Sequence, residues 1–181
     1  MSKFTAFLFC LLTIPLAAQA EDARLAGKHI VNLNGATCYE ISAKRGWQTI
    51  NTKGLDKFKF IILGPEHREF QKKKLGIARV FEGWSVDGAR YSKVGTHGHL
   101  GADAEALEPY AGFKYDRRFP FGALLMRVQH KDAMTINAKA RPGTSHTGDL
   151  KFDRVDFRIN DSDKSLADNS GEIFICVGDN S

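Results

Sequence analysis

The chain has 181 residues, of which 43% are hydrophobic and 26% are charged, and it carries a formal net charge of +5. This length is enough for one domain with a full core and short for two. The basic residues stand in scattered groups without interleaved aromatic residues, which argues against a nucleic-acid-binding surface and favours solvated strand faces. We therefore expect one domain that binds no nucleic acid.

Residues 1–20 have the pattern of a secretory signal peptide. Lys3 supplies a positive start, residues 4–16 are mostly apolar, and Ala18-Gln19-Ala20 is an Ala-x-Ala cleavage site. The apolar run is shorter than the roughly 20 residues that a membrane span needs, and nothing comparable follows it. We expect cleavage near Ala20 and a secreted or periplasmic domain of residues 21–181 without a transmembrane segment.

Two cysteines, Cys38 and Cys176, remain after this cleavage. The oxidising compartment of an exported chain favours a disulfide between them, which would tie an early segment to the last predicted strand. Two free thiols are the alternative.

Short runs of alternating apolar residues predict strands along most of the chain. Asn34 and Gly35 separate the first two runs, and this dipeptide is typical of a tight β-hairpin. Residues 86–119 form a long loop with one helix-prone patch at residues 103–107, and a loop of this length is usually functional or disordered. The expected strands are residues 23–33, 36–42, 47–50, 58–63, 74–84, 121–128, 134–140, 152–159 and 173–177. This pattern predicts an all-β fold, an antiparallel β-sandwich or jelly roll.

An oxygen-rich loop, residues 160–171, lies between the last two predicted strands. It contains Asp161, Asp163, Asp168, Asn169 and three serines, and calcium takes about 6 to 8 oxygen ligands of these kinds. A solvated turn is one alternative, although a plain hairpin needs only about 2 to 5 residues. An EF-hand also has oxygen ligands at this spacing, but it needs a glycine where Leu166 stands and helices on both sides.

Three motifs follow one another in order along the chain. Gly83-Trp84 ends a predicted strand before a glycine-containing loop, and residues 121–128 read Phe-Gly-Ala-Leu-Leu-Met-Arg-Val. Asn160-Asp161 is then followed, after six residues, by the Asp-Asn-Ser-Gly run of residues 168–171. Together these motifs resemble the PA-I galactophilic lectin family of calcium-dependent, galactose-binding β-sandwiches. The resemblance covers residues 74–179 and implies a galactose-binding-like domain to which residues 21–73 add further strands.

The resemblance also implies a calcium site. Its ligands are the side chains of Asp161, Asp168 and Asn169 and the backbone carbonyls of Ser165 and Asp87. Two vicinal hydroxyls of a galactoside then fill the remaining positions on the ion, and Asp161 and Asp168 accept hydrogen bonds from them. Residue 168 is aspartate where the family commonly has asparagine, and this extra charge is expected to tighten calcium binding.

The resemblance implies a further histidine contact to the sugar from the long loop, for which the chain offers His97 and His99. These two histidines in a His-x-His arrangement are alternatively half of a zinc site.

Five aromatic residues are assigned to two roles. Tyr91, Tyr110 and Tyr115 are candidates for stacking on a sugar face, because a tyrosine ring has an apolar body and a polar tip. Trp84 and Phe121 are expected in the core.

Motifs of hydrolytic enzymes are missing from the sequence, including Gly-x-Ser-x-Gly, His-Glu-x-x-His and the phosphate-binding loop. We therefore expect a secreted, calcium-dependent carbohydrate-binding protein that is not an enzyme. The first alternative is a structural or adhesion domain that calcium stabilises and that has no sugar affinity. The second is a glycan-active enzyme, because the carboxylate pair of a glycosidase leaves no local spacing.

Overall fold

The computed structural model describes residues 24–25, 27–33, 36–52, 58–65, 68, 82–128, 134–135, 146–148 and 153–178. These residues form an all-β fold with little helix, as expected, in which the strands make two sheets. The predicted signal peptide lies outside the described residues. No helix in the described part of the chain is long and apolar enough to cross a membrane.

The first sheet is built around β10. Its strand order is β1 (Arg24–Leu25), β4 (Gln48–Asn51), β10 (Arg154–Ile159), β7 (Leu124–Val128) and β8 (Met134–Thr135). β1 pairs with β4 in parallel, and the other neighbours are antiparallel.

The second sheet is antiparallel and is built around β11. Its strand order is β2 (Gly27–Leu33), β3 (Ala36–Ser42), β11 (Ser170–Gly178), β5 (Phe58–Leu63) and β9 (His146–Gly148), and β6 (Gly83–Ser85) also pairs with β11. The antiparallel pair of β2 and β3 confirms the expected hairpin, whose Asn34-Gly35 turn lies outside the described residues.

Two predicted strands are described only in part. From residues 74–84 the structure describes residues 82–84, and β6 extends the strand to Ser85. From residues 134–140 it describes only β8. The sequence prediction missed β9, because its three residues, His-Thr-Gly, carry no apolar alternation.

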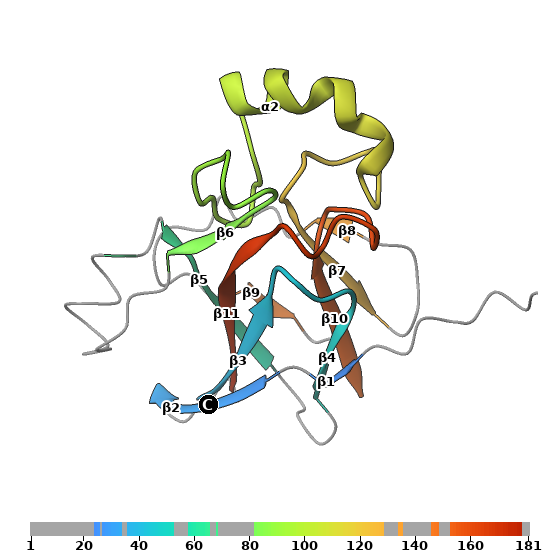
Figure 1. Cartoon of the computed structure of the whole chain (residues 1–181). Coiled ribbons are helices and arrows are strands. Elements are labelled where there is room, and N and C mark those ends of the chain that lie inside the picture. The colour runs from blue at the N-terminus through green and yellow to red at the C-terminus, as the bar shows by residue number, and fades with distance from the viewer. Residues whose placement is uncertain are drawn as a thin grey trace, which may run out of the picture.

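The middle of the chain contains the helical segment that we call the cap. It consists of the α-helix α2 (Ala102–Leu107) and the 3-10 helix η2 (Glu108–Phe113), so the helix-prone patch at residues 103–107 is confirmed. Pro109 lies in the first turn of η2, where the missing N–H of proline costs nothing. Figure 1 shows the cap at one end of the sheets, above β6 and the loop that joins β10 to β11.

Side chains of both sheets share one hydrophobic cluster. Ile173, Ile175 and Val177 of β11 belong to this cluster. They alternate along the strand and therefore point to one face, as expected. β10 contributes every second residue in the same way: Val155, Phe157 and Ile159. The expectation that Trp84 and Phe121 are buried is confirmed, and the indole N–H of Trp84 donates to the carbonyl of Gly122 at 2.7 Å.

A disulfide joins Cys38 of β3 to Cys176 of β11 across a sequence separation of 138 residues. The two residues stand directly opposite each other in the antiparallel pair. This confirms the predicted link between an early segment and the last strand.

Candidate functional site

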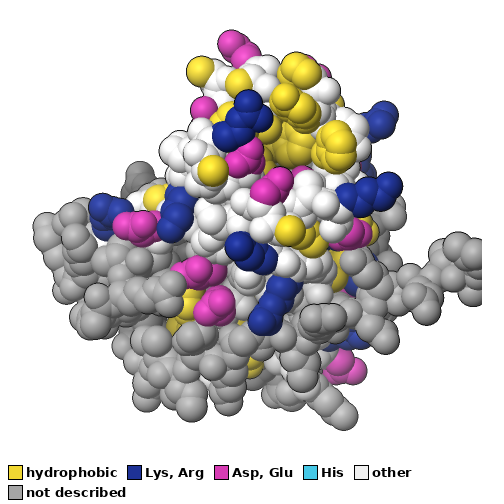
Figure 2. All heavy atoms as spheres, in the orientation of Figure 1, with side chains coloured by type: hydrophobic (Ala, Val, Ile, Leu, Met, Phe, Trp, Pro, Cys, Tyr) yellow, Lys and Arg dark blue, Asp and Glu magenta, His cyan; other side chains and the backbone are white. Residues whose placement is uncertain are grey.

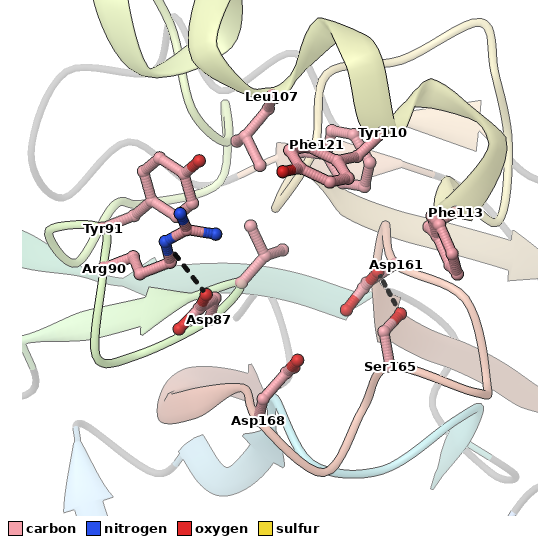
Figure 3. A pocket seen from close by; sticks show the side chains of 11 residues that line it. Asp87, Arg90, Tyr91, Leu107, Tyr110, Phe113, Phe121, Asp161, Ser165 and Asp168 are labelled. Atoms are coloured by element: carbon pink, nitrogen blue, oxygen red, sulfur yellow. Dashed lines mark hydrogen bonds and ion pairs between the residues drawn. The ribbon is translucent and has the colours of Figure 1, made fainter.

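One pocket of about 270 Å³ brings together residues from two segments that lie far apart in the sequence. Asp161, Ser165 and Asp168 come from the loop between β10 and β11, and Asp87 comes from the turn after β6. Figure 3 shows these residues around one shared space, which Tyr110 and Phe113 of the cap also line. Four of the five residues predicted to bind calcium therefore line the same pocket.

The pairing of β6 with β11 explains how Asp87 reaches this loop. β6 ends two residues before Asp87 and β11 begins two residues after Asp168, so the antiparallel register brings the two residues level. The backbone N–H of Gly88 donates to the carbonyl of Asp168 at 2.9 Å. The N–H of Asp87 donates to Oδ1 of Asn169 at 3.4 Å. These bonds fasten the turn to the loop.

Glycine is required where β6 crosses β11. Gly171 has a φ of 86°, in the left-handed region that side chains disfavour. A Cβ on Gly171 would also collide with the carbonyl oxygen of Gly83, which itself has a φ of 80°. The glycines of the Gly83-Trp84 and Asn-Ser-Gly motifs thus permit the close approach that joins the two halves of the pocket.

The carboxylate of Asp161 is held in place by its own loop. Its Oδ1 accepts hydrogen bonds from the Ser162 N–H at 2.8 Å and from the Ser165 hydroxyl at 2.7 Å, and the residue is 2% exposed. Burial raises the pKa of Asp161, hydrogen bonds from Ser165, Asn169 and Ser162 oppose this rise, and the negative charge of Asp168 adds to it. A buried carboxylate beside a second one is an environment in which a bound cation is favoured.

Asp87 lies in a tight turn that directs its side chain toward the pocket. Its backbone carbonyl accepts the N–H groups of Arg90 and Tyr91, at 3.0 and 3.1 Å, whereas its side chain lines the pocket. The φ of Asp87 is 50°, an unusual value for a residue other than glycine that fixes this tight turn. The turn thus places Asp87 beside the loop, with its side chain among the residues that line the pocket.

Asn169 is not among the residues that line the pocket. It is 1% exposed, and its Nδ2 donates to the carbonyl of Ala43 at 3.1 Å while its Oδ1 accepts the N–H of Asp87. The side chain therefore links the loop to the end of β3 as well as to the turn after β6.

The donor groups are gathered but not closed into a compact cluster. Within the described residues, no group of three or more His, Cys, Asp or Glu side chains is arranged to hold a metal ion. The residues around the pocket offer oxygen donors only, from carboxylates, an amide and hydroxyls. This chemistry fits a hard cation such as calcium, which accepts neutral oxygen ligands together with carboxylates.

The structure does not bring the two candidate histidines to this pocket. His99 is 0% exposed, with Nδ1 3.3 Å from Oδ2 of Asp103 and Nε2 accepting the N–H of Val86 at 3.4 Å. Burial lowers the pKa of His99, although hydrogen bonding and the charge of Asp103 work against this effect. His97 is exposed and its backbone bridges to Ala123, away from the pocket lining.

Arg158 supports the loop from the face of β10 opposite to Phe157 and Ile159, and the sequence motifs gave it no role. Its side chain is fully buried, and Nη2 donates to the carbonyl of Asp161 and to Oδ1 of Asp163, both at 2.7 Å. Its guanidinium lies 3.8 Å from the ring centroid of Tyr115, which in turn accepts the indole N–H of Trp47 at 3.1 Å. Tyr115 is thus engaged with Arg158 and Trp47 and does not line the pocket. The signal in the sequence was an arginine in an apolar strand just before an acidic loop.

Asn160 fastens the segment that follows the cap. Its Nδ2 donates to the carbonyls of Asp116, Phe119 and Pro120, at 3.0, 3.0 and 2.9 Å. Its Oδ1 accepts the N–H of Asp116 at 2.8 Å, and the residue is fully buried. In the Asn-Asp pair of the sequence motif, Asn160 therefore holds this segment and Asp161 lines the pocket.

The pocket also has apolar lining residues, which we call the apolar wall. Two of its members, Tyr110 and Phe113 of the cap, are 45% and 50% exposed, which is high for aromatic side chains of a small domain. The Ser162 N–H donates to the carbonyl of Phe113 at 2.6 Å, so the loop also positions this wall. Figure 2 shows hydrophobic side chains gathered at the cap end of the molecule. The wall consists of Val86, Tyr91, Leu107, Tyr110, Phe113 and Phe121.

Comparison with known proteins leaves the resemblance resting on the three motifs. No family model matches the chain, and no curated protein or solved structure matches it either.

Proposed function

We propose that this protein is an exported, calcium-dependent carbohydrate-binding protein whose two sheets form a galactose-binding-like β-sandwich. The observation that carries the proposal is that Asp87 and the loop from Asp161 to Asp168 line one pocket, as the lectin resemblance requires. The hydrophobic cluster shared by both sheets supports the sandwich, and the disulfide supports an oxidising compartment.

In this proposal Asp161, Asp168 and Asn169 hold the ion, with a further oxygen from Asp87 or Ser165. Bound calcium supplies open coordination positions that two vicinal sugar hydroxyls can fill. The carboxylates of Asp161 and Asp168 then accept hydrogen bonds from those hydroxyls, which are charge-assisted and therefore strong. The aspartate at position 168 adds negative charge to the site.

The apolar wall gives the same pocket a second kind of contact. Tyr110 and Phe113 line the pocket together with the carboxylates, so that one face of a sugar ring can lie against them. Sugar rings expose apolar C–H groups on one face, and aromatic side chains bury such surface favourably. Of the tyrosines named from the sequence, Tyr91 and Tyr110 remain candidates for this contact.

A calcium-stabilised structural domain is the second candidate. The hydrogen bonds between the turn after β6 and the loop, from Gly88 to Asp168 and from Asp87 to Asn169, favour it. An ion bound between these two segments would hold them together whether or not a sugar binds.

Thermal melting separates the two functions. Calcium is expected to raise the melting temperature and a chelator to lower it in both cases, because a ligand that binds the folded state stabilises it by RT ln(1 + [L]/Kd). Galactosides are expected to add stability only if the protein is a lectin, and only with calcium present. A melting temperature that responds to neither calcium nor chelator contradicts both candidates.

A further inference from the structure

A single cation, Arg90, is found among the described residues that line the pocket. It belongs to the tight turn after β6, where its N–H donates to the carbonyl of Asp87 at 3.0 Å and fixes the position of its backbone. Figure 3 shows its guanidinium reaching over Asp87 beside Tyr91. Arg90 is therefore a basic group held at the edge of an acidic pocket.

The guanidinium of Arg90 is only loosely engaged. Its Nε lies 3.9 Å from Oδ2 of Asp87, well beyond the 2.7–2.9 Å of a charge-assisted hydrogen bond, and its side chain is 65% exposed. Arg118 shows the contrast, because its guanidinium makes three hydrogen bonds of 2.6 to 3.1 Å to the carboxylate of Asp116. The planar donors of Arg90 are thus available to a group that enters the pocket.

The charges around the pocket decide which group that is. Three carboxylates, those of Asp87, Asp161 and Asp168, face one guanidinium, so the empty pocket repels an anion. A bound divalent cation offsets the two excess negative charges. An anionic ligand then meets a neutral pocket with a guanidinium that has spare donors.

We propose that Arg90 selects sugars that carry a carboxylate or a sulfate ester beside the hydroxyls that bind the ion. This inference rests on the calcium-dependent sugar binding proposed above and names its ligand class as acidic glycans. The carbohydrate supplies the hydroxyls for the ion, and its anionic group accepts hydrogen bonds from Arg90. Because the empty pocket is acidic, binding of the acidic sugar depends on calcium more steeply than binding of its neutral counterpart.

Calorimetric titration with matched sugars tests this. Methyl galactoside, methyl galacturonide and 6-O-sulfo methyl galactoside differ only at one carbon, and each is titrated into the full chain with and without calcium. We expect both acidic sugars to bind about tenfold more tightly than the neutral one at low salt, the factor that about 1.4 kcal/mol of interaction produces. Screening is expected to shrink this preference as salt rises.

The variant Arg90→Gln, titrated at saturating calcium, is expected to lose the preference for the two acidic sugars over methyl galactoside. Lys93→Gln is the matched control, because Lys93 lies three residues on, 3.5 Å from Glu82, and does not line the pocket. Melting temperatures check that both variants are folded.

Each result is decisive. Equal affinity for the three sugars, or a preference that survives in Arg90→Gln, overturns the role of Arg90 and leaves the proposed function standing. Loss of all sugar binding in a folded Arg90→Gln assigns Arg90 to the site itself and overturns the selective role. If the unaltered protein binds none of the sugars with calcium present, the proposed function fails and this inference fails with it.

Discussion

At the scale of single residues, the loop between β10 and β11 is held by side chains that do not reach the pocket. Arg158 holds the carbonyl of Asp161 from below, and Asn160 holds the segment after the cap. Both are fully buried, so their hydrogen bonds are made away from water, where a lost partner is costly.

The first prediction concerns Asn160. Replacement by alanine leaves the N–H of Asp116 and the carbonyl of Phe119 without their partner, whereas the carbonyls of Asp116 and Pro120 each keep a backbone N–H donor. We expect a loss of about 2 to 4 kcal/mol in the free energy of unfolding. Denaturant titration measures this change. Asn160→Asp is the matched comparison, because it keeps an acceptor for Asp116 and removes the three donations. An alanine variant as stable as the parent contradicts the anchoring role.

The second prediction concerns Asp156, which lies on β10 outside the pocket. Burial alone raises the pKa of Asp156, yet hydrogen bonds from Thr49, Arg127 and Arg154 and the charge of Arg154 bring it below its usual value. A depressed carboxyl pKa stabilises the folded state above the unfolded-state pKa of about 3.9. This contribution is lost as the pH falls through the lower, folded-state pKa.

We therefore expect the free energy of unfolding to drop as the pH is taken from about 5 to below 3. Asp156→Asn is expected to show a shallower drop and to be less stable at neutral pH by about 1 to 3 kcal/mol. Denaturant titrations across this pH range measure both effects. Parallel pH profiles for the two proteins would rule out Asp156 as a source of the acid sensitivity.

At the scale of elements, the strand β11 connects most of the structure to the site. It pairs with β3, β5 and β6, and the β6 pairing brings Asp87 level with Asp168. The disulfide fastens β11 to β3. The loop between β10 and β11 therefore ends, at Ser170, on a strand that is covalently anchored.

The third prediction concerns this disulfide. Its two cysteines are separated by 138 residues, and closing so long a loop in the unfolded chain is expected to stabilise the folded state by about 2 to 5 kcal/mol. The double variant Cys38→Ser with Cys176→Ser is compared with the oxidised parent by denaturant titration. The double variant is expected to be less stable than the oxidised parent by this amount and about as stable as the reduced parent. Equal stability of the oxidised parent and the double variant would contradict the prediction.

The elements and motifs that were predicted have local signals, and those that were missed do not. The alternation of β11 and the Asn34-Gly35 dipeptide are visible within a few residues, so the last strand and the first hairpin were correct. The role of Asn160 depends on backbone groups 40 to 44 residues away, and such contacts leave no spacing in the sequence. Arg158 contacts residues three and five positions further on, but the sequence does not show that its side chain is buried. The burial of His99 is likewise decided by tertiary packing, which no short pattern reports.

At the scale of the whole molecule, two β-sheets carry the loop between β10 and β11 and the helical cap at one end (Figure 1). The carboxylates come from the loops of β6 and β11, whereas the aromatic residues Tyr110 and Phe113 come from an inserted helical segment. The three sequence motifs point to the first half of this pocket only, because none of them lies in residues 102–113, which form the cap.

The most direct test of the account is a calorimetric titration of calcium into the unaltered protein and three variants. We predict one ion per chain, and a loss of affinity of at least about tenfold in Asp161→Asn and in Asp168→Asn, because ligand charge sets calcium affinity. Asp163→Asn is the control from the same loop, because the side chain of Asp163 is 47% exposed and does not line the pocket. The amide oxygen of the asparagine still offers an acceptor to Arg158. This variant is predicted to bind calcium as the parent does. No binding to the parent, or an equal loss in Asp163→Asn, would contradict the assignment of this loop as the calcium site.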